Sequence, residues 1–145
     1  MITQVKQVRE FMRAFQQEAP DEMRMLCVDI ISQRDEMFNE EWIELIESRN
    51  TVEQLDAITD MTYVLLGYYV AAGITPETAE AAFNEVHRSN MTKFWSASEI
   101  ESIPPGCRAT LTAGGRYIVK NQDGKVIKSP SYSPANLAQF VKGQA

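Results

Sequence analysis

The chain has 145 residues, of which 44% are hydrophobic and 23% charged, and its formal net charge is −6. This length suits one domain with a hydrophobic core, so we expect a single domain over residues 1–145. The sequence has neither a basic-then-apolar leader pattern nor a run of roughly 18 apolar residues, so we expect no membrane partner and a cytoplasmic protein.

Charge is distributed unevenly along the chain. Residues 1–105 carry 8 Lys/Arg and 19 Asp/Glu, whereas residues 106–145 carry 6 and 1. An acidic body argues against nucleic acid as a partner, because phosphate contacts require a positive surface. The basic tail either binds phosphates or covers the acidic body, and composition favours the second. Cys27 and Cys107 lie in no metal-ligand spacing, so we expect free thiols in a reducing cytosol.

The first half of the chain has the periodicity of helices. Apolar residues at helical spacing predict an amphipathic helix over Thr3–Gln17. Pro20 prevents this helix from continuing. A second helix is predicted over Asp21–Glu47, with a kink or break near Gln33–Asn39 because that stretch is polar.

Two further helices follow. The third is predicted to begin at an N-cap, Thr51, with Gln54 as a capping partner, and to stop at Gly73. The fourth is predicted over Thr75–Ser89, because a capping residue followed by proline is typical of a helix start.

Proline and glycine interrupt the remainder of the chain. A β-hairpin is predicted from Arg116–Lys120 and Lys125–Lys128 on either side of a turn at Asn121–Gly124, and a last helical turn at Asn136–Val141.

The predicted fold class is therefore all-α. We expect a bundle of four to five helices, with its helical body in residues 1–93, completed by oligomerisation because its apolar faces exceed what one small bundle buries. A small C-terminal β-hairpin and a basic tail are expected in residues 106–145.

Acidic residues interrupt the apolar third helix. The segment Leu55–Ala72 carries only two charges, Asp56 and Asp60, four residues apart on one face. Unpaired carboxylates are costly to bury, and two side by side repel each other. A cation between them and a partner surface would explain the pattern.

The preceding helix offers that partner surface. Glu40, Glu41 and Glu44 are spaced as neighbours on a helix. If the two helices pack antiparallel across a short Ser48–Thr51 turn, these carboxylates converge with Asp56 and Asp60. Such a cluster suits Mg²⁺ or Mn²⁺, which take oxygen ligands. The alternative is an ordinary solvated helix face.

These motifs resemble those of a known superfamily. The pattern Glu40-Glu41-x-x-Glu44 followed by an acidic helix ending in Asp60 resembles the signature of the all-α NTP pyrophosphohydrolases, which include MazG-like proteins, dimeric dUTPases and phosphoribosyl-ATP pyrophosphohydrolases. HRSNMTK (87–93) and DGKVIKSP (123–130) are similar to a short single-domain branch of the MazG-like and phosphoribosyl-ATP pyrophosphohydrolase-like group, often found in phages and bacteria. The usual ExxD motif has Ala57 in place of its glutamate.

The resemblance implies roles for individual residues. Glu41, Glu44 and Asp60 would bind the metal, with Asp56 as a fourth ligand in place of the missing glutamate. Glu40 is either another ligand or the base that orients the attacking water, so Glu40 and Glu41 are the expected catalytic residues. The phosphates would be held by Arg88, Asn90, Lys93, Lys125 and Lys128.

The implied activity is Mg²⁺-dependent hydrolysis of a nucleoside triphosphate to the monophosphate and pyrophosphate, with Mn²⁺ as a substitute. We expect a nucleotide-pool role with dGTP and GTP among the candidates, in a homodimer or homotetramer, located in the host cytoplasm if the source is a phage. The alternatives are the phosphoribosyl-ATP reaction of histidine synthesis and a non-catalytic ion-binding helical module.

Overall fold

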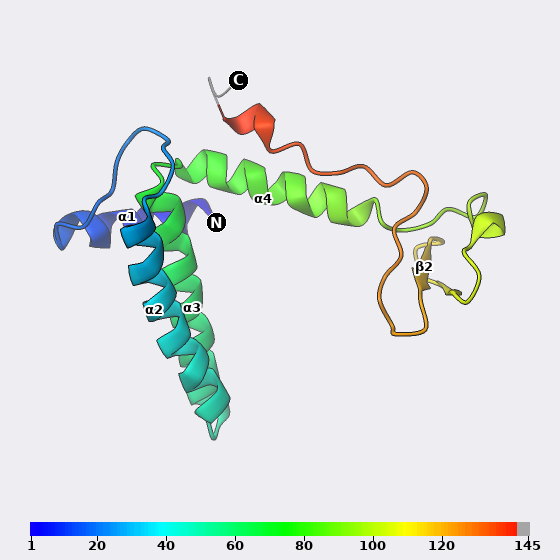
Figure 1. Ribbon diagram of the computed structural model, residues 1–145, viewed down its shortest axis with the longest axis horizontal. Helices are drawn as coiled ribbons and strands as arrows, with labels where there is room; N and C mark the ends of the chain where they lie inside the picture. The colour runs from blue at the N-terminus through cyan, green and yellow to red at the C-terminus, as the bar shows by residue number, and fades with distance from the viewer. Residues whose placement is uncertain (142–145) are drawn as a thin grey trace. The chain divides into compact units, whose positions relative to one another are not determined.

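A computed structural model describes residues 1–141 of the chain (Figure 1). The elements, in chain order, are α1 (Ile2–Ala14), α2 (Val28–Glu47), α3 (Thr51–Ala71), α4 (Pro76–Met91), β1 (Arg108–Leu111) and β2 (Tyr117–Lys120), with short 3₁₀ turns at Ile100–Ser102 and Ala138–Phe140. The predicted all-α class with a small C-terminal β-hairpin is confirmed.

The chain forms two compact units. One is Met1–Ala81 and the other begins at Ala82, so the division falls within α4. The single domain and the completion of the bundle by oligomerisation remain predictions.

The core of the first unit lies where α1 meets α3. Val5, Val8 and Met12 form one buried face of α1, and they pack with Leu66 and Val70 of α3. Helices α2 and α3 lie side by side as an antiparallel hairpin (Figure 1). The predicted convergence of the acidic residues of α2 and α3 required this antiparallel packing.

Helix α2 begins later than predicted and is continuous over Val28–Glu47. The expected start at Asp21 is wrong because the preceding loop is held against the end of α3, where the Arg24 backbone N–H donates to the Ala72 carbonyl at 2.9 Å. Gly73 (φ +68°) has no room for a side chain, because a Cβ there would overlap the Glu22 carbonyl. The expected kink is also absent, since the polar stretch forms a mostly exposed helix face.

The N-cap of α3 is Asn50, one residue before the predicted Thr51. The Asn50 Oδ1 accepts the backbone N–H groups of Val52 and Glu53, each at 3.0 Å, and the Glu53 carboxylate accepts from Asn50 Nδ2 at 2.8 Å. Asparagine and its partner therefore supply the reciprocal cap that was expected of Thr51 and Gln54.

Helix α1 starts close to the predicted Thr3 but ends at Ala14, before the predicted Gln17, because Gln16 has a non-helical φ of +56°. The end of α3 and the start of α4 agree with the predictions. Helix α3 ends at Ala71, just before Gly73. Helix α4 begins at Pro76, and the Thr75 hydroxyl accepts the Thr78 backbone N–H at 3.1 Å. Proline at the first helical position costs no intrahelical hydrogen bond there.

In the second unit, β2 pairs with a different partner from the one predicted. It pairs antiparallel with β1, from Arg108 opposite Lys120 to Leu111 opposite Tyr117. The loop between them turns at Gly115. Its φ of +73° is a backbone conformation that residues with a side chain rarely adopt. The segment expected to pair with β2 contributes only an isolated bridge from Val126 to Lys120.

Trp95 joins three segments of this unit. Its side chain is 2% exposed, and its indole N–H donates to the Ile127 carbonyl at 2.9 Å. Its backbone exchanges two hydrogen bonds of 2.9 Å with Tyr117. The buried indole, whose N–H has an acceptor, therefore holds β2 and the segment around Ile127 in place.

The structure also bears on the predictions about the cysteines and about membrane-spanning helices. Both cysteines are free thiols, as predicted. Among the helices described, none is by itself long and apolar enough to cross a membrane; α3 and α4 together, as a bent pair, reach that length and composition.

Candidate active site

The α2–α3 hairpin brings the predicted acidic residues close together. Glu41 is half-buried on α2. Its pKa is raised above the ordinary value, first by burial and then by the negative charges of Glu44, Asp60, Asp56 and Glu40. The other four carboxylates therefore raise the energy of the charged form of Glu41.

One oxygen of this cluster lacks any partner. Glu41 Oε2 is buried and accepts no hydrogen bond from the residues that the structure describes. A buried carboxylate oxygen without a donor, beside further negative charges, is costly. A hard divalent cation removes that cost, because it takes several carboxylate oxygens as ligands. Carboxylate oxygens are the type of ligand that Mg²⁺ prefers.

The carboxylates do not already form a finished metal centre. Within residues 1–141, no three His, Cys, Asp or Glu side chains are close enough together to hold one ion. The structure thus makes the acidic residues neighbours, while their roles as ligands remain predictions.

A pocket opens beside part of the cluster. It has a volume of about 230 Å³ and is lined by Glu44 and Asp56 together with Glu47, Ser48 and Glu53. Glu53 is occupied by the cap of α3. Glu47 was not singled out in the sequence, although its place three residues after Glu44 puts it next on the same helix face.

Ala57, which stands where the usual ExxD motif has glutamate, is buried in the structure. Ala57 is 1% exposed, whereas Asp56 is exposed. The position that carries glutamate in the usual motif therefore faces the interior of the unit. Asp56 does act on Glu41 electrostatically, so it remains the predicted fourth ligand.

Arg88, predicted to hold phosphate, is engaged within the second unit. Its guanidinium donates to both carboxylate oxygens of Glu85, at 2.7 and 2.8 Å, to Ser133 Oγ at 3.2 Å and to the Pro134 carbonyl at 3.1 Å. Arg88 and the Asn136 backbone N–H lower the pKa of Glu85 to about 2. The arginine therefore fastens the segment around residue 134 to α4.

Two of the predicted lysines meet at a tyrosine. Lys128 Nζ lies 4.2 Å from the centre of the Tyr132 ring. The pKa of Tyr132 is lowered, first by the hydrogen bond from Ser89 and also by the charges of Lys128 and Lys93. Lys128 and Lys93, two members of the predicted phosphate set, therefore both act on Tyr132.

Asn90 and Lys93 share a second pocket of about 240 Å³, whose other walls are Phe94, Ile118 and Val126. Lys125 is exposed in the turn that Asn121 stabilises, where its backbone N–H donates to Asn121 Oδ1 at 2.8 Å.

Hydroxyl side chains hold this region together, and they were not predicted as functional. Ser129 is buried and donates to the Thr92 carbonyl at 2.9 Å, while the Thr92 hydroxyl accepts the Ser133 backbone N–H at 3.0 Å. Their only sequence signal is membership of the two motifs HRSNMTK and DGKVIKSP.

Comparison with the models of known protein families gives a match. The model of the phosphoribosyl-ATP pyrophosphohydrolase family matches residues 8–90, more than half of the chain. That range contains all five acidic residues of the cluster, together with Arg88 and Asn90. No curated protein matches the chain.

Proposed function

Since the chain belongs to the phosphoribosyl-ATP pyrophosphohydrolase family, we propose that it is a Mg²⁺-dependent pyrophosphohydrolase that converts a nucleoside triphosphate and water to the monophosphate and pyrophosphate. The observation that carries the proposal is the buried, unpartnered oxygen of Glu41 among neighbouring carboxylates. A non-catalytic ion site would use the same arrangement, and the substitutions described below separate the two.

The reaction requires a water molecule to be deprotonated and aimed. The water oxygen attacks the α-phosphorus, the bond from this phosphorus to the oxygen bridging to the β-phosphorus breaks, and pyrophosphate leaves. Glu40 accepts the proton, since Glu41 is assigned to the cation.

Glu41, Glu44 and Asp60, with Asp56, would hold the cation. When bound, Mg²⁺, or Mn²⁺ in its place, neutralises phosphate charge and makes water more acidic. The remaining negative charge of the substrate requires cations from the protein, and we assign this role to Lys93 and Lys128.

The other members of the predicted phosphate set have supporting roles in this proposal. Asn90 and Lys125 contact the substrate from the same unit. Arg88 acts through the segment that it fastens, because its donors already have partners.

The family match favours a second substrate. Phosphoribosyl-ATP contains the same linkage between α- and β-phosphorus, and its hydrolysis would place the chain in histidine synthesis. A nucleotide-pool role, with dGTP and GTP among the candidates, uses the same residues. Assays with both kinds of substrate separate the two.

A second copy of the chain is proposed to cover the α2–α3 hairpin, giving a homodimer or homotetramer. Trp42 is 48% exposed and Leu55 66% exposed, and Ile43, Ile46 and Ile58 are exposed as well. Monomeric proteins rarely expose so many large apolar side chains together. Sedimentation as a monomer at micromolar concentration would contradict this assignment.

Substitutions in the acidic cluster test the proposed activity. Asp60→Asn and Glu44→Gln remove one negative charge each with little change in shape, and Glu36→Gln, an exposed acid outside the cluster, is the matched control. We expect the first two to abolish pyrophosphate release while helical content and melting temperature are kept, and the control to retain activity. A structural ion site would instead give lost thermal stability and no turnover in any variant.

A further inference from the structure

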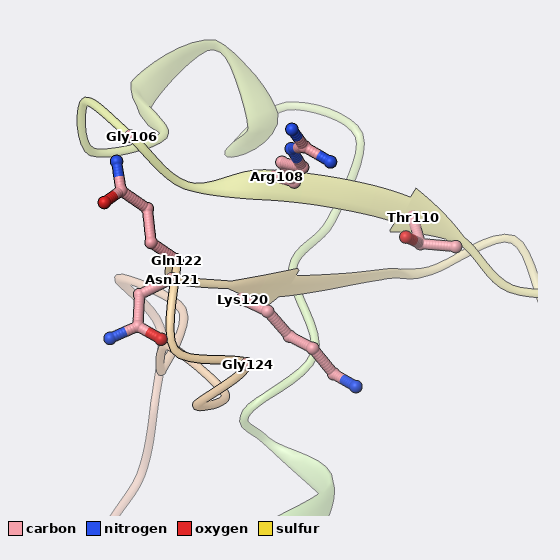
Figure 2. A pocket seen from close by; sticks show the side chains of 7 residues that line it. All are labelled: Gly106, Arg108, Thr110, Lys120, Asn121, Gln122 and Gly124. Atoms are coloured by element: carbon pink, nitrogen blue, oxygen red, sulfur yellow. The ribbon is translucent and has the colours of Figure 1, made fainter.

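A pocket of about 430 Å³ lies at the β-hairpin of the second unit (Figure 2). It is lined by Gly106, Arg108, Thr110, Lys120, Asn121, Gln122 and Gly124. The proposed hydrolytic function uses none of these residues.

The pocket contains an uncompensated pair of positive charges. Arg108 and Lys120 are register partners on the antiparallel strands β1 and β2. Like charges directly opposite each other destabilise such a pair. Neither residue forms an ion pair with any side chain between residues 1 and 141. Their charged ends are turned away from each other (Figure 2).

No acidic residue lines the pocket. Between residues 106 and 141 the only acid is Asp123, against five Lys and Arg residues. Asp123 does not line the pocket, and its carboxylate accepts from Asn121 Nδ2 at 3.3 Å. A ligand that neutralises this pocket must therefore be an anion.

The remaining lining groups are neutral and polar. Gly106 (φ +80°) admits the Gln122 amide, because a Cβ there would lie only 3.2 Å from Gln122 Nε2. Asn121 shapes the neighbouring turn by accepting the backbone N–H groups of Asp123 and Lys125 at 3.1 and 2.8 Å. The Thr110 hydroxyl completes a polar rim.

We propose that this pocket binds an oligophosphate, that is, a chain of two or more phosphoryl groups, either free or attached to a nucleoside. An arginine fork and a lysine ammonium both suit phosphoryl oxygens. Since the two charged ends point apart, an anion with charge at both ends satisfies them better than a single phosphate. The volume lies within the range of about 300–1,000 Å³ common for small-molecule sites.

Binding without turnover tests this proposal. Pyrophosphate is titrated calorimetrically into the full chain in excess EDTA, so that the acidic cluster has no metal and hydrolysis plays no part. We expect one saturable site per chain. The variant Arg108→Gln/Lys120→Gln should bind at least tenfold more weakly, while Lys6→Gln/Arg49→Gln, which loses the same charge at exposed positions of the first unit, should bind as the parent chain does.

Two further titrations decide the location and the ligand. Lys128→Gln removes a cation of the proposed substrate site and should leave pyrophosphate binding in EDTA unchanged. A nucleoside diphosphate that binds more tightly than pyrophosphate would identify the nucleotide-attached form, and equal or weaker binding the free form. The proposal is overturned if pyrophosphate does not bind, if Lys128→Gln abolishes binding, or if the double variant at Arg108 and Lys120 binds normally. A chain that binds pyrophosphate as expected but hydrolyses no nucleotide would contradict the proposed function and not the proposed binding pocket.

Discussion

The guanidinium of Arg34 lies against Gly67, in the space that any β-carbon at residue 67 would fill. Arg34 is 8% exposed, and it donates to Met12 Sδ at 3.2 Å and to the Val64 carbonyl at 3.5 Å. Burial lowers its pKa, although an arginine stays charged in proteins. This one side chain thus contacts α1 and α3 from α2 and fixes how the acidic helices pack.

The first prediction follows from that contact. Gly67→Ala should destabilise the fold by about 2 kcal/mol, as overpacking of a filled site does, measured by denaturant unfolding. Gly114→Ala, where the nearest neighbour of a Cβ is a hydroxyl at 3.9 Å, is the control and should have little effect. Combining Gly67→Ala with Arg34→Ala should recover part of the loss, and a purely additive double variant would contradict the clash.

The second prediction concerns metal and the acidic cluster. Excess Mg²⁺ should raise the melting temperature, since a ligand at a hundred times its Kd stabilises a protein by about 2.7 kcal/mol. Glu41→Gln removes a buried negative charge, so it should raise the melting temperature in EDTA. It also removes a proposed ligand, so the rise in melting temperature on adding Mg²⁺ should be smaller than in the parent chain. An equal Mg²⁺ gain in both proteins would show that the ion binds elsewhere.

The third prediction concerns pH and Glu85. Because its pKa falls from 4.5 to about 2 on folding, the carboxylate stabilises the second unit above pH 4.5, and this contribution is lost as the pH falls from 4.5 towards 2. Unfolding midpoints measured across that window should fall more steeply for the parent chain than for Glu85→Gln. Parallel curves for the two proteins would mean that the Arg88 and Asn136 contacts contribute nothing in solution.

The fourth prediction compares the two tryptophans. Trp95→Phe removes the hydrogen bond to the Ile127 carbonyl and should cost at least about 1 kcal/mol, because a buried acceptor loses its donor. Trp42→Phe, at an exposed position, should change stability by less than half of that. Differential scanning calorimetry of each variant and of the parent chain measures the change, because it detects unfolding of both units. Equal effects would contradict the anchoring role of Trp95.

The helices and the neighbourhood of the acidic residues could be predicted from the sequence because both depend on local spacing. Periodic apolar residues indicate α1, and capping and stop residues indicate α3. A short connection between two helices makes them antiparallel neighbours, which is enough to bring Glu41 towards Asp60. The start of α4 was likewise predictable, since the Thr75 cap acts on its own first turn.

What could not be predicted depends on contacts between distant residues. The late start of α2 depends on a hydrogen bond from Arg24 to Ala72, and the partner of β2 was misassigned because two segments have compatible patterns. Arg34 gave no sign of burial, as a charged residue in a polar stretch normally faces water. The Arg108–Lys120 pocket could be recognised only once the register of β1 and β2 was known.

The most direct test of the central claim is pyrophosphate release from the eight common ribo- and deoxyribonucleoside triphosphates and phosphoribosyl-ATP, with Mg²⁺ and then Mn²⁺, using Asp60→Asn as the blank. We predict turnover of one or a few of these substrates, with the monophosphate as co-product and no signal from the blank. No turnover of any of them, or equal release by Asp60→Asn, would contradict the assignment of the acidic cluster as a hydrolytic centre.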